Sequence, residues 1–222
     1  MTDFFKVQPV NRTFEPVRVA SINPDVDVSA TAETIWATGG AYTYRTTAAV
    51  IAFSSSSASD TAVTALVVGL DATYALVSET VALNGTTPVN TVNSYLRVHS
   101  VELSAVAVGA VSGGTIVTIA AGATYWDAAI YTVPLGYSAY LVAVNASTTL
   151  AMDAEIFLRT REVGRPFKNV FTRVVTASAP LDYTFAAPIY LPAKTDIDMQ
   201  AVNASTANTR VHAGFEIWLS KD

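Results

Sequence analysis

The near absence of helical periodicity constrains the fold of this chain more than any other feature of its sequence. The apolar runs are short, rich in Val, Ile, Thr, Tyr and Phe, and separated by Gly, Pro, Asn and Ser, which is typical of strands and turns. The clearest strand is the final one, where apolar and polar side chains alternate over 211–220. Alternation at 152–158 and 196–201 indicates further half-buried strands, and Asn84-Gly85 predicts a hairpin over 73–98. The sequence therefore predicts an all-β protein.

Two segments, 130–158 and 189–219, resemble each other. Each contains Ala-Val-Asn-Ala-Ser-Thr after an Ile-Tyr pair and a proline, Pro134 or Pro192. Two equivalent units suit the two Greek keys of a jelly roll. We therefore predict a β-sandwich of the jelly-roll type in which Asn145 and Asn203 are equivalent. Chance reuse of a favourable turn sequence is the alternative.

The first 28 residues differ from the rest of the chain. Three prolines are spaced through them, and their apolar content is too low for independent folding. We expect residues 1–28 to form an extended N-terminal arm and residues 29–222 to form a single β-sandwich body, although a chain of this length could also form two small domains. Because Phe4, Phe5 and Phe14 are unfavourable in water, the arm should lie on a neighbouring subunit or along its own sandwich. A frayed terminus is the alternative.

The composition favours an oligomer. Charged residues make up 14% of the 222 residues and apolar residues 51%, whereas about 25% charged residues is usual in soluble domains. Part of the surface is therefore expected to be covered by other subunits. The net charge of −5 gives no support for binding of nucleic acid, which requires a basic face. No uncharged apolar stretch approaches the length of a membrane span. Nucleic acid and membrane are not expected partners, and synthesis is expected in the cytoplasm.

The usual catalytic motifs are missing from the sequence. There is no Gly-x-Ser-x-Gly elbow, P-loop or His-x-x-x-His pair. The two histidines, His99 and His212, are expected to be structural, and without cysteine there is no thiolate metal site. Asp196 and Asp198 could bind Ca²⁺ or act as an acid and a base, but two exposed surface carboxylates are the expected arrangement. We expect no enzyme activity, no cofactor and no metal.

Positive charge is concentrated in one short stretch of this acidic chain. The residues are Arg159, Arg161, Arg165, Lys168 and Arg173. Because arginine is enriched at interfaces and pairs with carboxylates in a bidentate manner, the stretch is a candidate docking patch for an acidic protein surface. A solvated loop is the alternative.

A second functional hypothesis is a carbohydrate-binding module at a tail or fibre tip. Jelly rolls include lectins, and exposed aromatic rings stack on sugars. The candidate rings are Trp36, Tyr42, Tyr125 and Trp126.

Several turn and strand signatures give the chain a resemblance to a family of tailed-bacteriophage virion proteins. They lie at 35–42, 53–61, 69–71, 79–86, 93–98 and 130–136. The resemblance implies a β-sandwich or jelly-roll particle component such as a capsid decoration or cement protein, and it brings no catalytic residue with it. Because the composition also favours an oligomer, the resemblance leads us to expect a homo-oligomer, with a trimer favoured. Its partners would be the major capsid protein or other virion proteins, its location the virion, and its assembly site the host cytoplasm.

Overall fold

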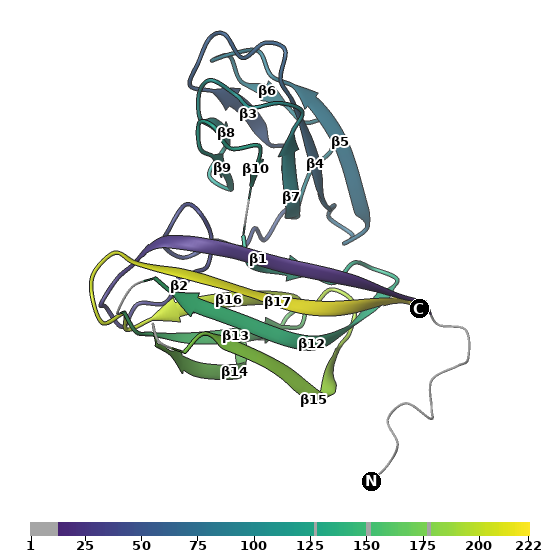
Figure 1. Cartoon of the computed structure of the whole chain (residues 1–222). Helices are drawn as coiled ribbons and strands as arrows, with labels where there is room; N and C mark the ends of the chain where they lie inside the picture. Colours follow the sequence, from purple (N-terminus) through teal and green to yellow (C-terminus); the bar gives the residue numbers. More distant parts are fainter. Residues whose placement is uncertain (1–12, 127, 150–151, 177–178) are drawn as a thin grey trace.

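The computed structural model describes residues 13–126, 128–149, 152–176 and 179–222, and these residues form two packed β-sandwiches (Figure 1). The larger one, here called the body, contains β1, β2 and β11 to β17. The smaller one, the inserted domain, contains β3 to β10 and lies between β1 and β11 in the chain. The all-β prediction is confirmed.

The body is built from two antiparallel sheets. The first has the order β1-β17-β12-β15, and the second has the order β11-β16-β13-β14 with the short β2 also paired to β16. The strands are β1 (Phe14–Val26), β2 (Glu33–Thr34), β11 (Ile130–Thr132), β12 (Tyr137–Thr148), β13 (Ala154–Arg161), β14 (Lys168–Val175), β15 (Leu181–Leu191), β16 (Asp196–Val202) and β17 (Thr209–Lys221). Apart from β2 and the β13–β14 hairpin, each strand of the body lies in the opposite sheet from the one before it.

The core of the body follows from strand alternation. In β17 the side chains of Val211, Phe215 and Ile217 are buried between the sheets, as the sequence pattern predicts. In β13 every second residue is buried for the same reason. In β16 all seven residues are buried, because other parts of the chain also cover its outer face. The half-buried strand expected there is therefore buried on both faces.

The inserted domain has its own core. Its sheets have the orders β10-β7-β4-β5 and β6-β3-β8-β9. The strands are β3 (Ala52–Ser55), β4 (Thr64–Leu70), β5 (Leu76–Ala82), β6 (Val89–Asn90), β7 (Arg97–Leu103), β8 (Val111–Gly113), β9 (Val117–Ile119) and β10 (Tyr125–Trp126). Phe53 and Tyr95 are fully buried between these sheets. The chain thus has two clusters of buried side chains where one sandwich was expected over 29–222, because strand alternation predicts which face is buried but not which strands share a sandwich.

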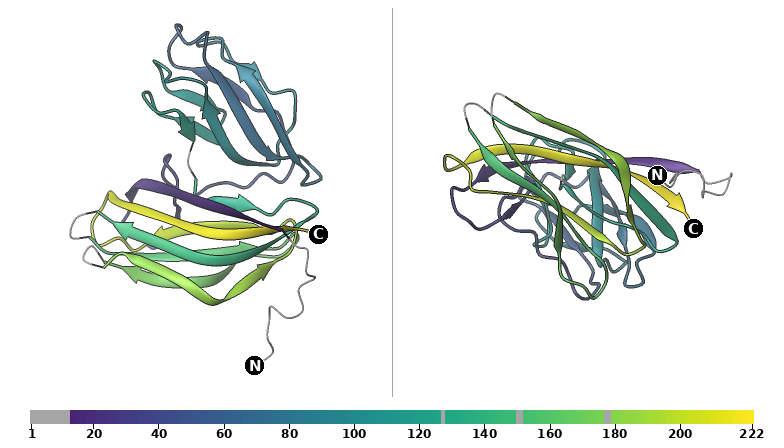
Figure 2. Two further views of the ribbon diagram at one scale, coloured as in Figure 1. Left: turned by 45° about the vertical axis from the view of Figure 1, so that its right-hand side comes forward. Right: turned by 90° about the horizontal axis from the view of Figure 1, so that it is seen from below.

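The two chain segments that connect the domains run side by side. Trp36 forms an antiparallel bridge with Ala128, and the Ala129 amide donates to the Ile35 carbonyl at 2.8 Å. Figure 2 shows the inserted domain standing on the body above this double connection.

Residues 14–26 of the expected arm lie along the chain's own sandwich, which is one of the two placements expected from the sequence. They form β1, which pairs with β17 from Phe14↔Ser220 to Val26↔Thr209. The prolines do not prevent this, because β1 is an edge strand and half of its amides need no partner strand. Residues 1–12, which include Phe4 and Phe5, lie outside the described residues.

The two similar segments, 130–158 and 189–219, have the same backbone conformation after their prolines but not at their asparagines. Pro134 and Pro192 each follow a strand, and the second residue after each proline has a positive φ, 82° at Gly136 and 67° at Lys194. Asn145, however, lies inside β12, whereas Asn203 follows β16 with a φ of 53°. The predicted equivalence of Asn145 and Asn203 is therefore wrong.

The Asn84-Gly85 turn is present, but the predicted hairpin is not. The Thr87 amide donates to the Asn84 carbonyl at 3.0 Å, and Gly85 has a φ of 56°. The strands on either side, β5 and β6, nevertheless belong to different sheets. The turn therefore carries the chain across the sandwich, and β5 pairs with β4 instead.

Candidate functional site

Arginines and aspartates form a charged network at the junction of the two domains. Arg159 and Arg161 on β13 lie opposite Asp198 and Asp196 on β16. Each guanidinium donates twice to one carboxylate oxygen, and the shorter N–O distance is 2.6 Å in both pairs. The cross-strand register therefore sets two parallel ion pairs on the outer face of the second sheet.

Arg97 connects the inserted domain to this network. It lies at the start of β7 and is 5% exposed, and it donates to both oxygens of Asp196 at 2.8 and 3.1 Å. The Thr132 hydroxyl on β11 also donates to Asp196 at 2.6 Å. Burial alone would raise the pKa of Asp196, but the hydrogen bonds and charges of Arg97, with Thr132 and Arg161, outweigh it and lower the pKa. The ionised form of Asp196 is therefore the stable one.

Two aromatic rings enclose the charged groups. The Arg97 and Arg161 guanidiniums lie 5.0 and 4.8 Å from the centre of the Tyr44 ring. Phe167 lies under Arg159 and Arg161 at 4.2 and 4.4 Å. Cation–π contacts of this kind stabilise cations that are partly removed from water. The junction therefore contains charged side chains that are held in place by ion pairs and aromatic rings.

These contacts overturn two sequence expectations. Asp196 and Asp198 were expected on an exposed face, but they are 3% and 0% exposed, since the segment after β2 and the inserted domain cover β16. Arg159 and Arg161 are bonded within the chain and do not form the expected docking patch. Of the other candidates, Arg165, Lys168 and Arg173 are exposed.

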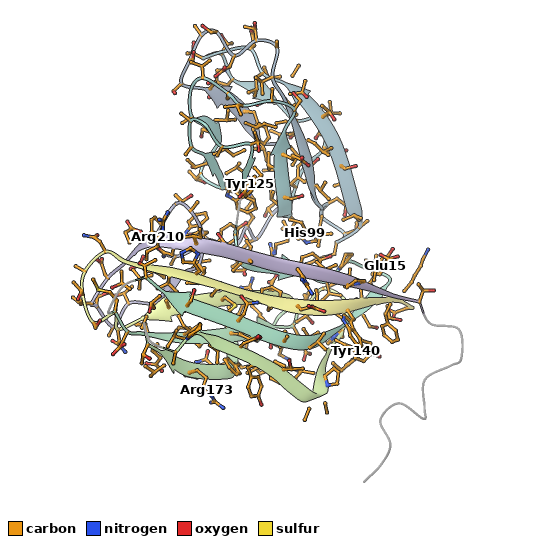
Figure 3. The ribbon with its side chains drawn as sticks, in the orientation of Figure 1. Glu15, His99, Tyr125, Tyr140, Arg173 and Arg210 are labelled. Atoms are coloured by element: carbon orange, nitrogen blue, oxygen red, sulfur yellow. The ribbon has the colours of Figure 1, made fainter. Side chains whose placement is uncertain are left out.

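The exposed candidates do not lie in one place. Arg165 and Lys168 lie at the β13–β14 turn, whereas Arg173 is further along β14, over the rings of Phe171 and Tyr183 at 5.3 and 5.8 Å. Figure 3 shows Arg173 at the edge of the body that lies away from the inserted domain. The five residues predicted as one patch are thus divided by the fold.

The candidate sugar-binding rings do not form an exposed platform. Trp36, Tyr42 and Trp126 are 5%, 6% and 3% exposed and belong to the core of the inserted domain. The Trp36 indole donates to the Gly40 carbonyl at 2.9 Å, and its ring packs edge-on against Tyr42. Tyr125 alone of these four is exposed, at 57%. The expectation of four stacking rings is therefore wrong.

A row of aromatic side chains lies on the outer face of the first sheet, near the ends of β1 and β17. Tyr140 on β12 contacts Phe14 and Tyr190 edge-on, with 5.6 Å between ring centres in both pairs. Trp218 lies 6.1 Å from Phe14 and opposite Tyr140 in the register. Tyr190 is 51% exposed, whereas Tyr140 is only 6% exposed; Figure 3 labels Tyr140 near this end of the first sheet. We call these four residues the aromatic row.

A hollow of about 600 Å³ continues the same face beyond the aromatic row. Ala20 and Ala143 contribute small side chains to it, and Arg18 and Glu216, joined at 3.0 Å, line its side. Gly214 lies opposite Ala20, and a Cβ atom there would approach the Val19 carbonyl to 2.5 Å. The face therefore combines an aromatic end with a recessed middle.

Sequence reasoning missed Arg97, Tyr140 and Tyr190. The alternation of side chains along each strand indicates that Tyr140 and Tyr190 point away from the core. That the two rings lie close together depends on the pairing of β12 with β15, which the sequence does not reveal. Arg97 gives no local signal, because its partner Asp196 lies 99 residues away in the chain.

The described residues contain neither a metal cluster nor a membrane helix. No group of three or more His, Asp or Glu side chains among them is placed to hold a metal ion. No helix in the same part of the chain is long and apolar enough to span a membrane. His99 stacks on Tyr131 with 4.1 Å between ring centres, and burial lowers the pKa of His99 to about 4. His99 is thus neutral at physiological pH.

Comparisons with known proteins give little further information. No protein-family model matches the sequence, and no curated protein matches it. Two solved structures are weakly similar, one of infectious bursal disease virus strain Gt and one of the VP2 subviral particle of the same virus. The matches cover 96% of this chain and 79% and 73% of the respective structures, at 11% identity and a TM-score of 0.21. These neighbours are viral capsid structures, but the similarity is too low to carry an argument about function.

Proposed function

We propose that this chain is a structural subunit of a bacteriophage particle, a capsid decoration or cement protein that binds other virion proteins without catalysing a reaction. The observation that carries the proposal is the outer face of the first sheet, where Tyr190 at the end of the aromatic row is 51% exposed and lies on the same face as a hollow of about 600 Å³. An exposed aromatic side chain on a sheet face can anchor a protein partner.

The size of this face suits a stable interface. Its four strands contain 13, 13, 12 and 11 residues. At roughly 4.8 Å between strands and 3.3 Å per residue, the face measures on the order of 20 by 40 Å. The resulting 800 Å² is about the area that each partner buries in a stable protein complex. The face could therefore be the whole docking surface.

The position of the inserted domain leaves this face free. Its ion pair to the body runs from Arg97 to Asp196 on the second sheet. The first sheet can thus lie against a shell while the inserted domain contacts something else. A homo-oligomer, with a trimer favoured, would multiply each weak contact through avidity. The virion resemblance in the sequence agrees with this arrangement.

Two exposed tyrosines provide a matched test. Tyr190 lies in the aromatic row and Tyr125 on the inserted domain, and they are 51% and 57% exposed. Binding of Tyr190→Asp and Tyr125→Asp to particles stripped of this protein would be compared with wild type by co-sedimentation, and wild type would be located on particles by cryo-electron microscopy. Loss of an aromatic hot spot costs about 2 kcal/mol or more, so Tyr190→Asp should bind roughly 30-fold more weakly.

The control separates the alternatives. Tyr125→Asp should bind the particle like wild type. Loss of binding in Tyr125→Asp alone would place the attachment on the inserted domain, and unchanged binding in both variants would refute docking through the first sheet.

A further inference from the structure

A cavity of about 270 Å³ lies at the domain junction beside the charged network. Four arginines line it, and they come from different parts of the fold. Arg45 follows the segment that leads into the inserted domain, Arg97 begins β7, Arg161 ends β13, and Arg165 lies in the β13–β14 turn. Cationic groups of both domains therefore converge on one space.

The charges that line this cavity are not balanced. Asp196 is its only acidic lining residue, so four guanidiniums face one carboxylate, an excess of three positive charges. Asp196 is already shared between Arg97 and Arg161. The chain as a whole carries a net charge of −5, so this concentration of positive charge is a local feature. Like charges held close together and partly removed from water are unfavourable without a counter-ion.

The arginines differ in how firmly they are held. One Arg97 nitrogen donates to the Arg45 and Leu96 carbonyls at 2.8 and 2.9 Å. Arg45 donates to the Ala49 and Tyr95 carbonyls at 2.9 and 3.1 Å. The exposed Arg165 side chain has neither an ion pair nor a hydrogen bond to any residue in the described ranges. Its guanidinium is thus free to bind a ligand next to a fixed cationic wall.

We propose that the junction cavity binds one small oxyanion group, a phosphate, sulfate or carboxylate. Guanidinium forks match the paired oxygens of these groups, and the cavity is smaller than the roughly 300–1,000 Å³ of pockets for drug-sized ligands. The bound group would bridge the inserted domain and the body, since Arg97 and Arg165 belong to different domains. This site is separate from the face of the first sheet and does not depend on the proposed function.

The test uses the full chain and three probes: sodium phosphate, sodium sulfate and sodium glucuronate, each at constant ionic strength with sodium chloride. Binding would be measured by isothermal titration calorimetry and by the shift in melting temperature. We expect saturable binding to the wild-type protein and, in Arg165→Ala, an affinity lower by roughly tenfold or more, since charge-assisted hydrogen bonds are lost.

Arg173→Ala is the matched control, because Arg173 is an exposed arginine on β14 that does not line the cavity. It should bind like wild type. Saturation by glucuronate alone would identify a carboxylate source such as an acidic sugar, and saturation by phosphate or sulfate would identify an inorganic or ester anion. Absence of saturation with all three probes, or equal affinity in wild type and Arg165→Ala, would overturn the proposal.

Discussion

Replacing Asp196 by asparagine should destabilise the protein strongly, because this carboxylate holds the domain junction together. Asp196 accepts five hydrogen bonds, two from Arg97, two from Arg161 and one from Thr132. Asparagine has nearly the same size but no charge. Arg97, which is 5% exposed, would then keep its positive charge in a buried site without a counter-charge.

The expected magnitude follows from this burial. Removing one partner of a buried ion pair typically costs about 3–5 kcal/mol. Arg161 has a side chain that is 27% exposed, so water can partly replace its lost partner, and its contribution should be smaller. The pair Arg18–Glu216 provides the comparison, since the Arg18 side chain is 83% exposed. Breaking an exposed pair of this kind typically costs about 0–1 kcal/mol.

Equilibrium unfolding in urea at pH 7, followed by tryptophan fluorescence and circular dichroism, would compare wild type, Asp196→Asn and Glu216→Gln. A double variant, Arg97→Met with Asp196→Leu, should lose less stability than Asp196→Asn, because it removes the buried charge of Arg97 together with its partner and leaves only the partly exposed Arg161 unpaired. If Asp196→Asn were no less stable than Glu216→Gln, the network would not be what fixes the junction, and the argument from burial would be refuted.

Three other predictions concern pH, packing and domain independence. The pKa of His99 is lowered to about 4 by burial, so protonation favours the unfolded state. Stability should therefore fall as the pH decreases from about 6.5 to 4, and His99→Gln should flatten this part of a pH series of melting temperatures. Gly214→Val should displace β1 from β17, since its side chain would meet the Val19 carbonyl, and hydrogen exchange in β1 should accelerate. Phe53→Ala should destabilise the inserted domain by about 3–5 kcal/mol, and Phe215→Ala the body. A scanning-calorimetry profile in which each variant lowers a different transition would support two separate cores, whereas a single shared transition would contradict them.

Much of the fold could be predicted from local patterns. Alternation in β17 and β13 correctly identified the buried residues, because the period of a strand fixes which side chains face the core. The Asn84-Gly85 turn was also identified. Its neighbouring strands were paired wrongly, since a turn sequence determines the local φ angles but not the sheet in which the next strand finds a partner. The two separate cores were missed for the same reason.

The candidate site was predicted less well, because burial depends on distant segments. Asp196 and Asp198 alternate with apolar residues, which is typical of a strand with one face in water. Their outer face is covered by chain from residues 33–46 and by the inserted domain, and no local pattern reports such coverage. Likewise, Trp36 and Trp126 are aromatic residues next to turns, and nothing in their neighbouring sequence distinguishes a core ring from an exposed one.

The pairing of β1 with β17 has a consequence for the synthesis of the chain. Phe14 and Ser220 are neighbours in the first sheet but are 206 positions apart in the sequence. At about 5–20 residues per second, a ribosome needs roughly 10–40 s to add the partner strand after β1 has been made. During that interval every strand of the inserted domain emerges and can fold on its own. The edge of β1 meanwhile has no partner from its own chain, so crowded synthesis on neighbouring ribosomes should favour mispairing at this strand before any other.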